Sequence, residues 1–221
     1  DLVRSRGLGD VYKRQGYIPA AIRALQSKYP GITIGVRVLE NDAARLATVR
    51  GEVDFGIFFE PQTVRDLAVR SFVEVVLGFV TPTGHPLGGK REARFSSCVG
   101  SRLIVPAEPL AVYEQISVLE GTTGVVIDRA VSSDNIQMIT SLVLQGIGIG
   151  VLTSLDVITE VQRGLLSFTK ISDPILRPMT LALCTASART PSYAAGIALQ
   201  EIENGFPQLS YPISIDGPAM T

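Results

Sequence analysis

The sequence is poor in the residues that most often carry chemistry. Its 221 residues include one histidine, two cysteines and no tryptophan. A catalytic histidine needs a nucleophile and an orienting acid beside it, and the residues around His85 suggest neither. The histidine, cysteine and acidic residues show no metal-ligand spacing, and the serines lack the strand–turn–helix setting of a nucleophile elbow. We therefore expect a protein that is not an enzyme and that carries no metal or cofactor.

Long apolar runs and charge clusters are missing as well. No apolar segment approaches the length of a membrane span, so we expect a soluble domain with no membrane partner. Charged residues make up 19% of the chain and apolar residues 46%, a balance that supports a sizeable core. The net charge is −1, and no lysine and arginine cluster is present to grip phosphates. Cys98 and Cys184 lack motif spacing; we expect free thiols, with a disulfide as the open alternative.

The first fifteen residues differ from the rest of the chain. They show no apolar period, and their four basic and two acidic residues give a charge of +2, which leaves −3 for the remaining residues. Asp10–Gln15 resembles the translation of a transposon end used in sequencing libraries. We therefore expect residues 1–15 to be a non-native leader that takes no part in the fold, with a natural polar leader as the alternative. If the leader fills an edge position of a sheet, its ladder hydrogen bonds could stabilise the domain.

From Gly16 onward, helical and strand patterns alternate. The first helix has an apolar stripe from Ile18 to Tyr29 and ends at Pro30-Gly31. A strand at 32–38, a short helix at 43–50 and a buried strand at 53–59 follow, and they predict a parallel strand–helix–strand unit. Further strands are predicted at 71–81, 102–105, 125–130, 149–152, 166–171 and 179–185, with helices near 113–119, after Ser132-Ser133-Asp134, after Ser154 and at 192–203. Residues 206–221 are expected to form a loose tail.

The run Gly146-Ile147-Gly148-Ile149-Gly150 superficially resembles a dinucleotide-binding loop. Such a loop follows a strand and opens a helix, so that the helix N-terminus meets the pyrophosphate. Here the glycines follow a predicted helix and precede a predicted strand. We interpret them as a tight helix-to-strand turn, and we assign His85 to a turn as well.

An α/β body without catalytic residues points to ligand binding. Open α/β sheets bind small molecules outside the carboxyl ends of their strands, on the loops that follow. This favours a sensor over an enzyme, and it selects polar or aromatic residues that follow predicted strands. The candidate effector-binding residues are Asn41, Phe59, Thr81, Glu108, Tyr113 and Ser132. We expect Ser132 to lie at a helix N-terminus.

Five short segments form an ordered set along the chain. They are Pro19 with Tyr29–Ile32, Gly51–Ile57, Gly84–Leu87, Leu142–Leu152 and Arg163–Leu166. In order and spacing they resemble the effector-binding domain of LysR-type transcriptional regulators, over residues 16–203. Each segment alone is weakly specific, and the ordered set is specific.

The resemblance implies an α/β fold of the type 2 periplasmic-binding-protein kind. It consists of two Rossmann-like lobes with an effector cleft between them. Lobe one would comprise 16–73 and 172–205, lobe two 74–171, and the tail 206–221. The family also has an N-terminal winged helix-turn-helix that reads DNA. By comparison with the family, we expect this chain to lack that domain and the first strand of lobe one.

The resemblance also implies a function and partners. The domain would sense a small-molecule effector and assemble a cytoplasmic, bacterial DNA-binding regulator as a homodimer or homotetramer, with DNA bound only through the missing N-terminal domain. Effector binding would shift the population of lobe arrangements. In the family, helix 18–28 of one protomer packs against helix 135–145 of another. The alternative is a solute-binding protein of a transporter, which shares the fold.

The resemblance bears on the effector too. The family's pattern puts contacts on the loops of the six candidate residues. Some relatives carry a basic residue where Phe59 stands, and it holds a carboxylate. Phe59 and nearby Glu108 therefore favour a neutral, cationic or aromatic effector, although an anion could use the amide groups at Ser132.

Overall fold

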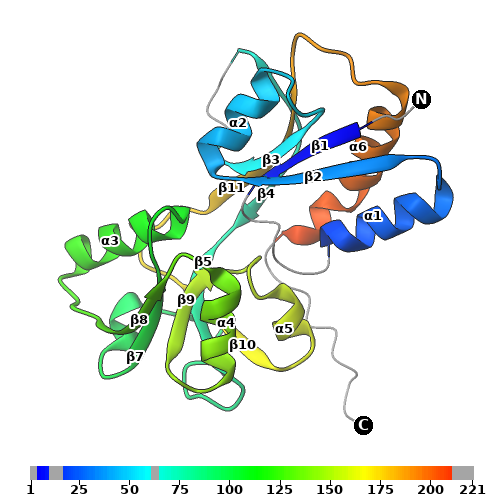
Figure 1. The fold of residues 1–221 in the computed structure, drawn as a ribbon. Coiled ribbons are helices and arrows are strands. Elements are labelled where there is room, and N and C mark those ends of the chain that lie inside the picture. Colours follow the sequence, from blue (N-terminus) through cyan, green and yellow to red (C-terminus); the bar gives the residue numbers. More distant parts are fainter. Residues whose placement is uncertain (1–3, 10–16, 61–64, 211–221) are drawn as a thin grey trace. The chain divides into compact units, whose positions relative to one another are not determined.

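The structure, a computed structural model, describes residues 4–9, 17–60 and 65–210 (Figure 1). The chain divides into two units of mixed helix and strand. Unit 1 contains the described residues up to Glu74 together with Met179–Ser210, and unit 2 contains Val75–Pro178. The lobe boundaries expected from the sequence, 73/74 and 171/172, stay a prediction. The mixed α/β architecture is confirmed.

Unit 1 is built on two small sheets flanked by helices. Its elements are β1 (Arg4–Gly9), α1 (Tyr17–Lys28), β2 (Thr33–Leu39), α2 (Asn41–Val49), β3 (Gly56–Phe59), β4 (Leu67–Val75), β11 (Met179–Ala186), α6 (Tyr193–Gly205) and the 3-10 helix η3 (Phe206–Leu209). Strand β1 pairs with β2 in parallel, and β11 stands between β3 and β4. Because β1 also contacts β3, it lies beside both β2 and β3.

Strand β1 forms in the segment that was expected to take no part in the fold. Arg4–Gly9 pairs with Thr33–Leu39, with one register shift between Arg6 and Leu8. A parallel ladder is made by backbone groups, so a segment without an apolar period can supply it. The expectation is therefore wrong for Arg4–Gly9, which fills a position beside β2. That residues 1–15 are non-native stays a prediction.

Helices α1 and α6 pack against each other. The buried residues of α1 are Ile18, Ala21 and Leu25, which recur at helical spacing and confirm the predicted stripe up to Leu25, whereas Tyr29 lies beyond the helix and is 41% exposed. At one end the Tyr17 hydroxyl donates a hydrogen bond to the Ile202 carbonyl, and burial raises the pKa of Tyr17 to about 12. At the other end Lys28 Nζ lies 2.9 Å from Glu201 Oε2. Both ends of α1 thus contact the same part of α6, at the neighbouring residues Glu201 and Ile202.

The chain continues as ordered structure beyond α6. Phe206 and Leu209, both in η3, are 0% and 4% exposed. The expected loose tail is therefore wrong for 206–209, because these apolar side chains enter the core of unit 1. Residues 211–221 of that tail lie outside the described part of the chain.

Unit 2 is built on one sheet of six strands within the described residues. Its elements are β5 (Leu77–Pro82), β6 (Glu92–Ala93), the 3-10 helix η2 (Phe95–Cys98), β7 (Arg102–Pro106), α3 (Ala111–Thr123), β8 (Asp128–Ser133), α4 (Ile136–Leu144), β9 (Ile149–Thr153), α5 (Ile158–Gln162) and β10 (Leu166–Ile171). The strand order is β6-β10-β5-β9-β7-β8.

Strand direction decides which residues share an edge of this sheet. Strand β7 runs parallel to β8 and β9, and β6 runs parallel to β10. Strand β5 runs antiparallel to its two neighbours, β9 and β10. Five strands therefore end at one edge, which we call the carboxyl edge of unit 2, and β5 begins there and ends at the opposite edge.

Two predicted strands differ from the observed ones. The strand expected at 71–81 is two strands, β4 in unit 1 and β5 in unit 2, because the chain passes between the units at Val75. The strand expected at 125–130 is β8, which begins at Asp128. The side chains of β8 are exposed or half-buried, so the apolar run that precedes it lies outside the strand.

The two thiols are free and buried, as expected. Cys98 belongs to unit 2 and Cys184 to unit 1. Burial raises the pKa of Cys98 to about 11 and that of Cys184 to about 12. Both thiols therefore stay protonated near neutral pH, the form that is poor at disulfide exchange.

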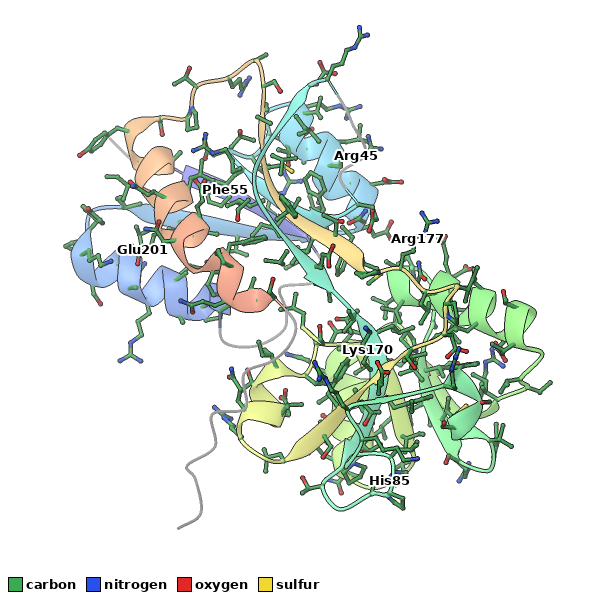
Figure 2. The ribbon with its side chains drawn as sticks, turned by 180° about the vertical axis from the view of Figure 1, so that it is seen from behind. Arg45, Phe55, His85, Lys170, Arg177 and Glu201 are labelled. Carbon is green, nitrogen blue, oxygen red and sulfur yellow. The ribbon has the colours of Figure 1, made fainter. Side chains whose placement is uncertain are left out.

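The two predicted turns are confirmed. Gly146, with φ of 72°, follows the end of α4 and leads into β9. The Cβ of any other residue at Gly148 would come within 2.5 Å of the Arg102 carbonyl oxygen, so the second glycine allows β9 to approach β7. His85, labelled in Figure 2 on the loop after β5, accepts a hydrogen bond at Nδ1 from the Leu87 N–H at 3.2 Å. Neither segment has the setting of a catalytic or dinucleotide site.

Candidate functional site

Asn41 and Phe59 meet at the end of β3 in unit 1. The Asn41 Nδ2 donates to the Phe59 carbonyl at 3.0 Å, and the Asn41 Oδ1 accepts from the Phe59 N–H at 2.7 Å. One side-chain amide thus satisfies both backbone groups of the last residue of β3. Asn41 lies in the first turn of α2, so this clamp joins the start of α2 to the end of β3.

Phe59 and its neighbour Glu60 differ in how far their side chains are exposed to solvent. The Phe59 side chain is only 6% exposed, so it belongs to the core more than to a loop surface. Glu60 is exposed and has a φ of 45°, which is uncommon for a residue other than glycine. Its Oε1 accepts from the Thr180 N–H at 2.7 Å, and its own N–H donates to the Thr180 carbonyl. The accessible polar group at this strand end is therefore Glu60, which the sequence analysis did not select.

In unit 2, three candidate residues lie near the ends of β7 and β8. Glu108 is exposed on the loop between β7 and α3, and Tyr113 is 36% exposed in the first turn of α3. Ser132 is exposed and pairs in register with Val105 across the two strands. These three residues therefore lie on neighbouring elements at the carboxyl edge of unit 2.

Ser132 does not lie at a helix N-terminus, contrary to the prediction. It lies within β8, and the N-cap of α4 is Asn135, whose Oδ1 accepts from the Met138 N–H at 3.2 Å. Asparagine is among the best N-cap residues, so the signal was present in the sequence. The serine pair before it is an equally good capping signal, so the sequence alone does not distinguish the two positions.

Thr81 lies away from the other candidates of unit 2. It is fully buried in β5, near the end of that strand and hence at the edge opposite to the carboxyl edge. Its hydroxyl has no hydrogen-bond partner among the described residues. The expectation that Thr81 follows its strand and presents a polar group on a loop is wrong, because β5 continues to Pro82 and Thr81 is buried within it.

The described residues contain no group of three histidine, cysteine or acidic side chains that could hold a metal ion. In the same residues, no helix is both long and apolar enough to cross a membrane. The candidate residues offer amide, hydroxyl, carboxylate and aromatic groups, which bind and orient ligands.

Several solved structures of LysR-family regulators have a similar fold. The regulatory domain of CcmR from Synechocystis PCC6803, in complex with 2-PG, is 21% identical, with a TM-score of 0.73 over 94% of this chain and 99% of that chain. HinK, a LysR family transcriptional regulator from Pseudomonas aeruginosa, is 15% identical, with a TM-score of 0.69 over 94% and 72% of the two chains. The BenM effector-binding domain with benzoate is 16% identical, with a TM-score of 0.67 over 93% and 96%. These likenesses establish the fold, which is that of LysR effector-binding domains.

Sequence comparison identifies the family directly. No curated protein matches the chain in sequence. The family model of the LysR substrate binding domain matches residues 14–206, which is most of the chain. This match favours the regulator reading over the solute-binding protein of a transporter. The chain belongs to the family of LysR substrate-binding domains.

Proposed function

We propose that this domain senses a small-molecule effector through the residues at its strand ends. The observation that carries the proposal is the family match over residues 14–206. It is supported by the clustering of polar groups at the end of β3 in unit 1 and at the carboxyl edge of unit 2. The residues assigned to the effector are Asn41, Glu60, Glu108, Tyr113 and Ser132.

The effector in this proposal carries a neutral or cationic polar group. Glu60 and Glu108 are both exposed acids, and Asn41, Tyr113 and Ser132 are uncharged. Phe59 stands at the position where a basic residue would favour a carboxylate ligand, and its side chain is buried. Carboxylates attract a cation and repel an anion at close range. An amine is therefore favoured over a carboxylate of the same size.

The test is calorimetry with three probes of equal size and different charge, benzylamine, benzamide and benzoate. We expect benzylamine or benzamide to bind more tightly than benzoate. Glu108→Gln is expected to weaken benzylamine binding about two- to five-fold, the range of an exposed ion pair. Ser132→Ala is expected to weaken binding by a similar factor. Tighter binding of benzoate than of both other probes would contradict the proposed effector class.

Thr81→Val provides a matched control within unit 2. Valine has nearly the shape of threonine, and the Thr81 hydroxyl has no described hydrogen-bond partner. This variant should leave probe affinity unchanged. If neither Glu108→Gln nor Ser132→Ala alters the affinity of a probe that binds, the assignment of these residues is wrong.

We further propose that the domain associates with itself through α1 and α4. On α4, Met138 is 53% exposed and Leu144 is 42% exposed, although the opposite face of the helix is buried. On α1, small residues such as Ala20 are exposed and allow close approach of another helix. Sedimentation velocity at micromolar concentration should show a dimer, and Met138→Glu should shift it towards monomer. Monomer alone for the unchanged chain would refute this association.

DNA binding in this proposal belongs to a separate N-terminal domain of the parent protein, and the regulator works in the bacterial cytoplasm where its target DNA lies. The effector acts by binding one arrangement of the regulator better than another.

A further inference from the structure

Unit 2 has a cavity of about 330 Å³ that none of the candidate effector residues lines. It lies where β10 ends and β5 begins, and the segment 172–178 forms one wall. Strands β9 and β7 separate this position from β8, where Ser132 lies. The cavity thus lies at a different position along the carboxyl edge of unit 2 from the candidate effector residues.

The wall of the cavity carries equal numbers of positive and negative side chains. They are Lys170, Arg177, Glu92 and Asp173. Figure 2 labels Lys170 on β10 and Arg177 on the segment that follows it. Glu92 is the register partner of Lys170 on the parallel neighbour β6, so the two side chains leave the same face of the sheet.

Most of these charges lack a partner within the described part of the chain. The side chains of Lys170, Arg177 and Glu92 make no ion pair or hydrogen bond with a described residue. Asp173 uses one oxygen, Oδ2, to accept from the Phe95 N–H at 2.6 Å. That bond fixes its carboxylate at the wall and leaves Oδ1 for another donor. The cavity therefore offers both positively charged hydrogen-bond donors and negatively charged hydrogen-bond acceptors.

Part of the lining of the cavity is apolar. Val76, which precedes β5, and Leu77, its first residue, are 8% and 6% exposed and contribute to the lining. The Leu176 N–H donates to the Asp173 carbonyl at 3.0 Å, so the wall segment contains a turn. A ligand that fits must combine an apolar body with charges at its polar end.

We propose that this cavity binds a free α-amino acid with an apolar side chain. Its carboxylate takes the Lys170 ammonium and the Arg177 guanidinium as donors, and its ammonium takes Glu92 and Asp173 as acceptors. Its side chain lies on Val76 and Leu77. A simple anion would sit beside two unpaired carboxylates, and a simple cation beside two unpaired basic groups, whereas a zwitterion satisfies both.

The site stands beside the connection between the two units of the chain. Segment 172–178 leads from β10 directly into β11, which belongs to unit 1. An amino acid held by Asp173 and Arg177 would order this connection. The site thereby offers a second input to the regulator, independent of the effector residues.

The test is calorimetry of the full chain with L-leucine and two analogues that each lack one charge. L-Leucinamide lacks the carboxylate, and 4-methylpentanoate lacks the ammonium. We expect L-leucine to bind and each analogue to bind about ten-fold or more weakly, because each loses charged hydrogen bonds. Absence of L-leucine binding at millimolar concentration, or equal binding of either analogue, would overturn the proposal.

Single variants locate the binding. Arg177→Gln and Glu92→Gln remove exposed charges and should each weaken L-leucine binding about two- to five-fold, and thermal melting should show that both variants stay folded. Arg102→Gln is the matched control, because Arg102 is an exposed arginine of unit 2 on β7 and does not line the cavity. L-Leucine affinity that falls in Arg102→Gln as much as in Arg177→Gln would place the binding elsewhere.

Variants of the candidate effector residues distinguish the effector site from this cavity. Ser132→Ala and Glu108→Gln should leave L-leucine affinity unchanged while they weaken benzylamine binding. If they weaken L-leucine instead, the amino acid occupies the effector residues and the second site is refuted, although the proposed function stands.

Discussion

Replacing Phe206 with alanine is expected to lower the free energy of unfolding by about 3–5 kcal/mol. Phe206 is fully buried in η3, directly after α6, so truncation leaves a cavity in the core of unit 1. Urea denaturation followed by circular dichroism would measure the loss as a lower midpoint with an unchanged slope. The result bears on where the folded domain ends, because the sequence suggests a loose tail from this residue onward.

Tyr193→Ala provides the control for this variant. Tyr193 is an aromatic residue at the other end of α6 and is 86% exposed, so little packing is lost when its ring is removed. Its effect should stay within about 0.5 kcal/mol. If Phe206→Ala and Tyr193→Ala unfold at the same urea concentration, Phe206 is not part of the core.

The elements with a strong local signal could be predicted from the sequence. The stripe of α1, the position of α6 and the glycine turn before β9 follow from patterns within short segments of the sequence. These features depend on residues within a few positions of each other. They can therefore be predicted without knowledge of the rest of the chain.

Features that depend on distant partners could not be predicted. Strand β1 has no apolar period, and its ladder is made with β2, more than twenty residues further along the chain. The direction of β5 follows from its pairing with β9 and β10, and this direction places Thr81 at the opposite edge from Ser132. The residues of β5 carry no sign of that direction.

Which residues bind the effector stays a prediction, but the structure shows how the candidate residues are held. Asn41 and Phe59 do meet at a strand end, but through a backbone clamp that uses the amide of Asn41. Glu60, with its positive φ and its bond to Thr180, becomes visible only once β3 is paired with β11. Side-chain roles at strand ends are set by such pairings, which is why sequence selects the loops better than the residues.

Replacing Phe95 with alanine is expected to lower the free energy of unfolding of unit 2 by about 3–5 kcal/mol. Phe95 is fully buried, and its ring stacks on Phe79 of β5 with centroids 6.4 Å apart and an interplanar angle of 9°. Truncation removes this ring pair and leaves a cavity beneath η2. Hydrogen exchange at the backbone amides of β5 would report the loss within unit 2, as protection falls there before it falls in β11.

The loss would come from packing and not from the backbone contact of the same residue. The Phe95 N–H, which binds Asp173 Oδ2, is retained in Phe95→Ala, so the wall of the cavity near segment 172–178 keeps that hydrogen bond. Phe72→Ala is the matched control, since Phe72 is 63% exposed on β4 and its loss should change stability by about 1 kcal/mol or less. Equal protection of β5 in Phe95→Ala and the unchanged chain would show that the stacked pair does not hold unit 2 together. A loss of amide protection confined to β5 would show that the Phe79–Phe95 pair stabilises β5, the first strand of the unit 2 sheet along the chain.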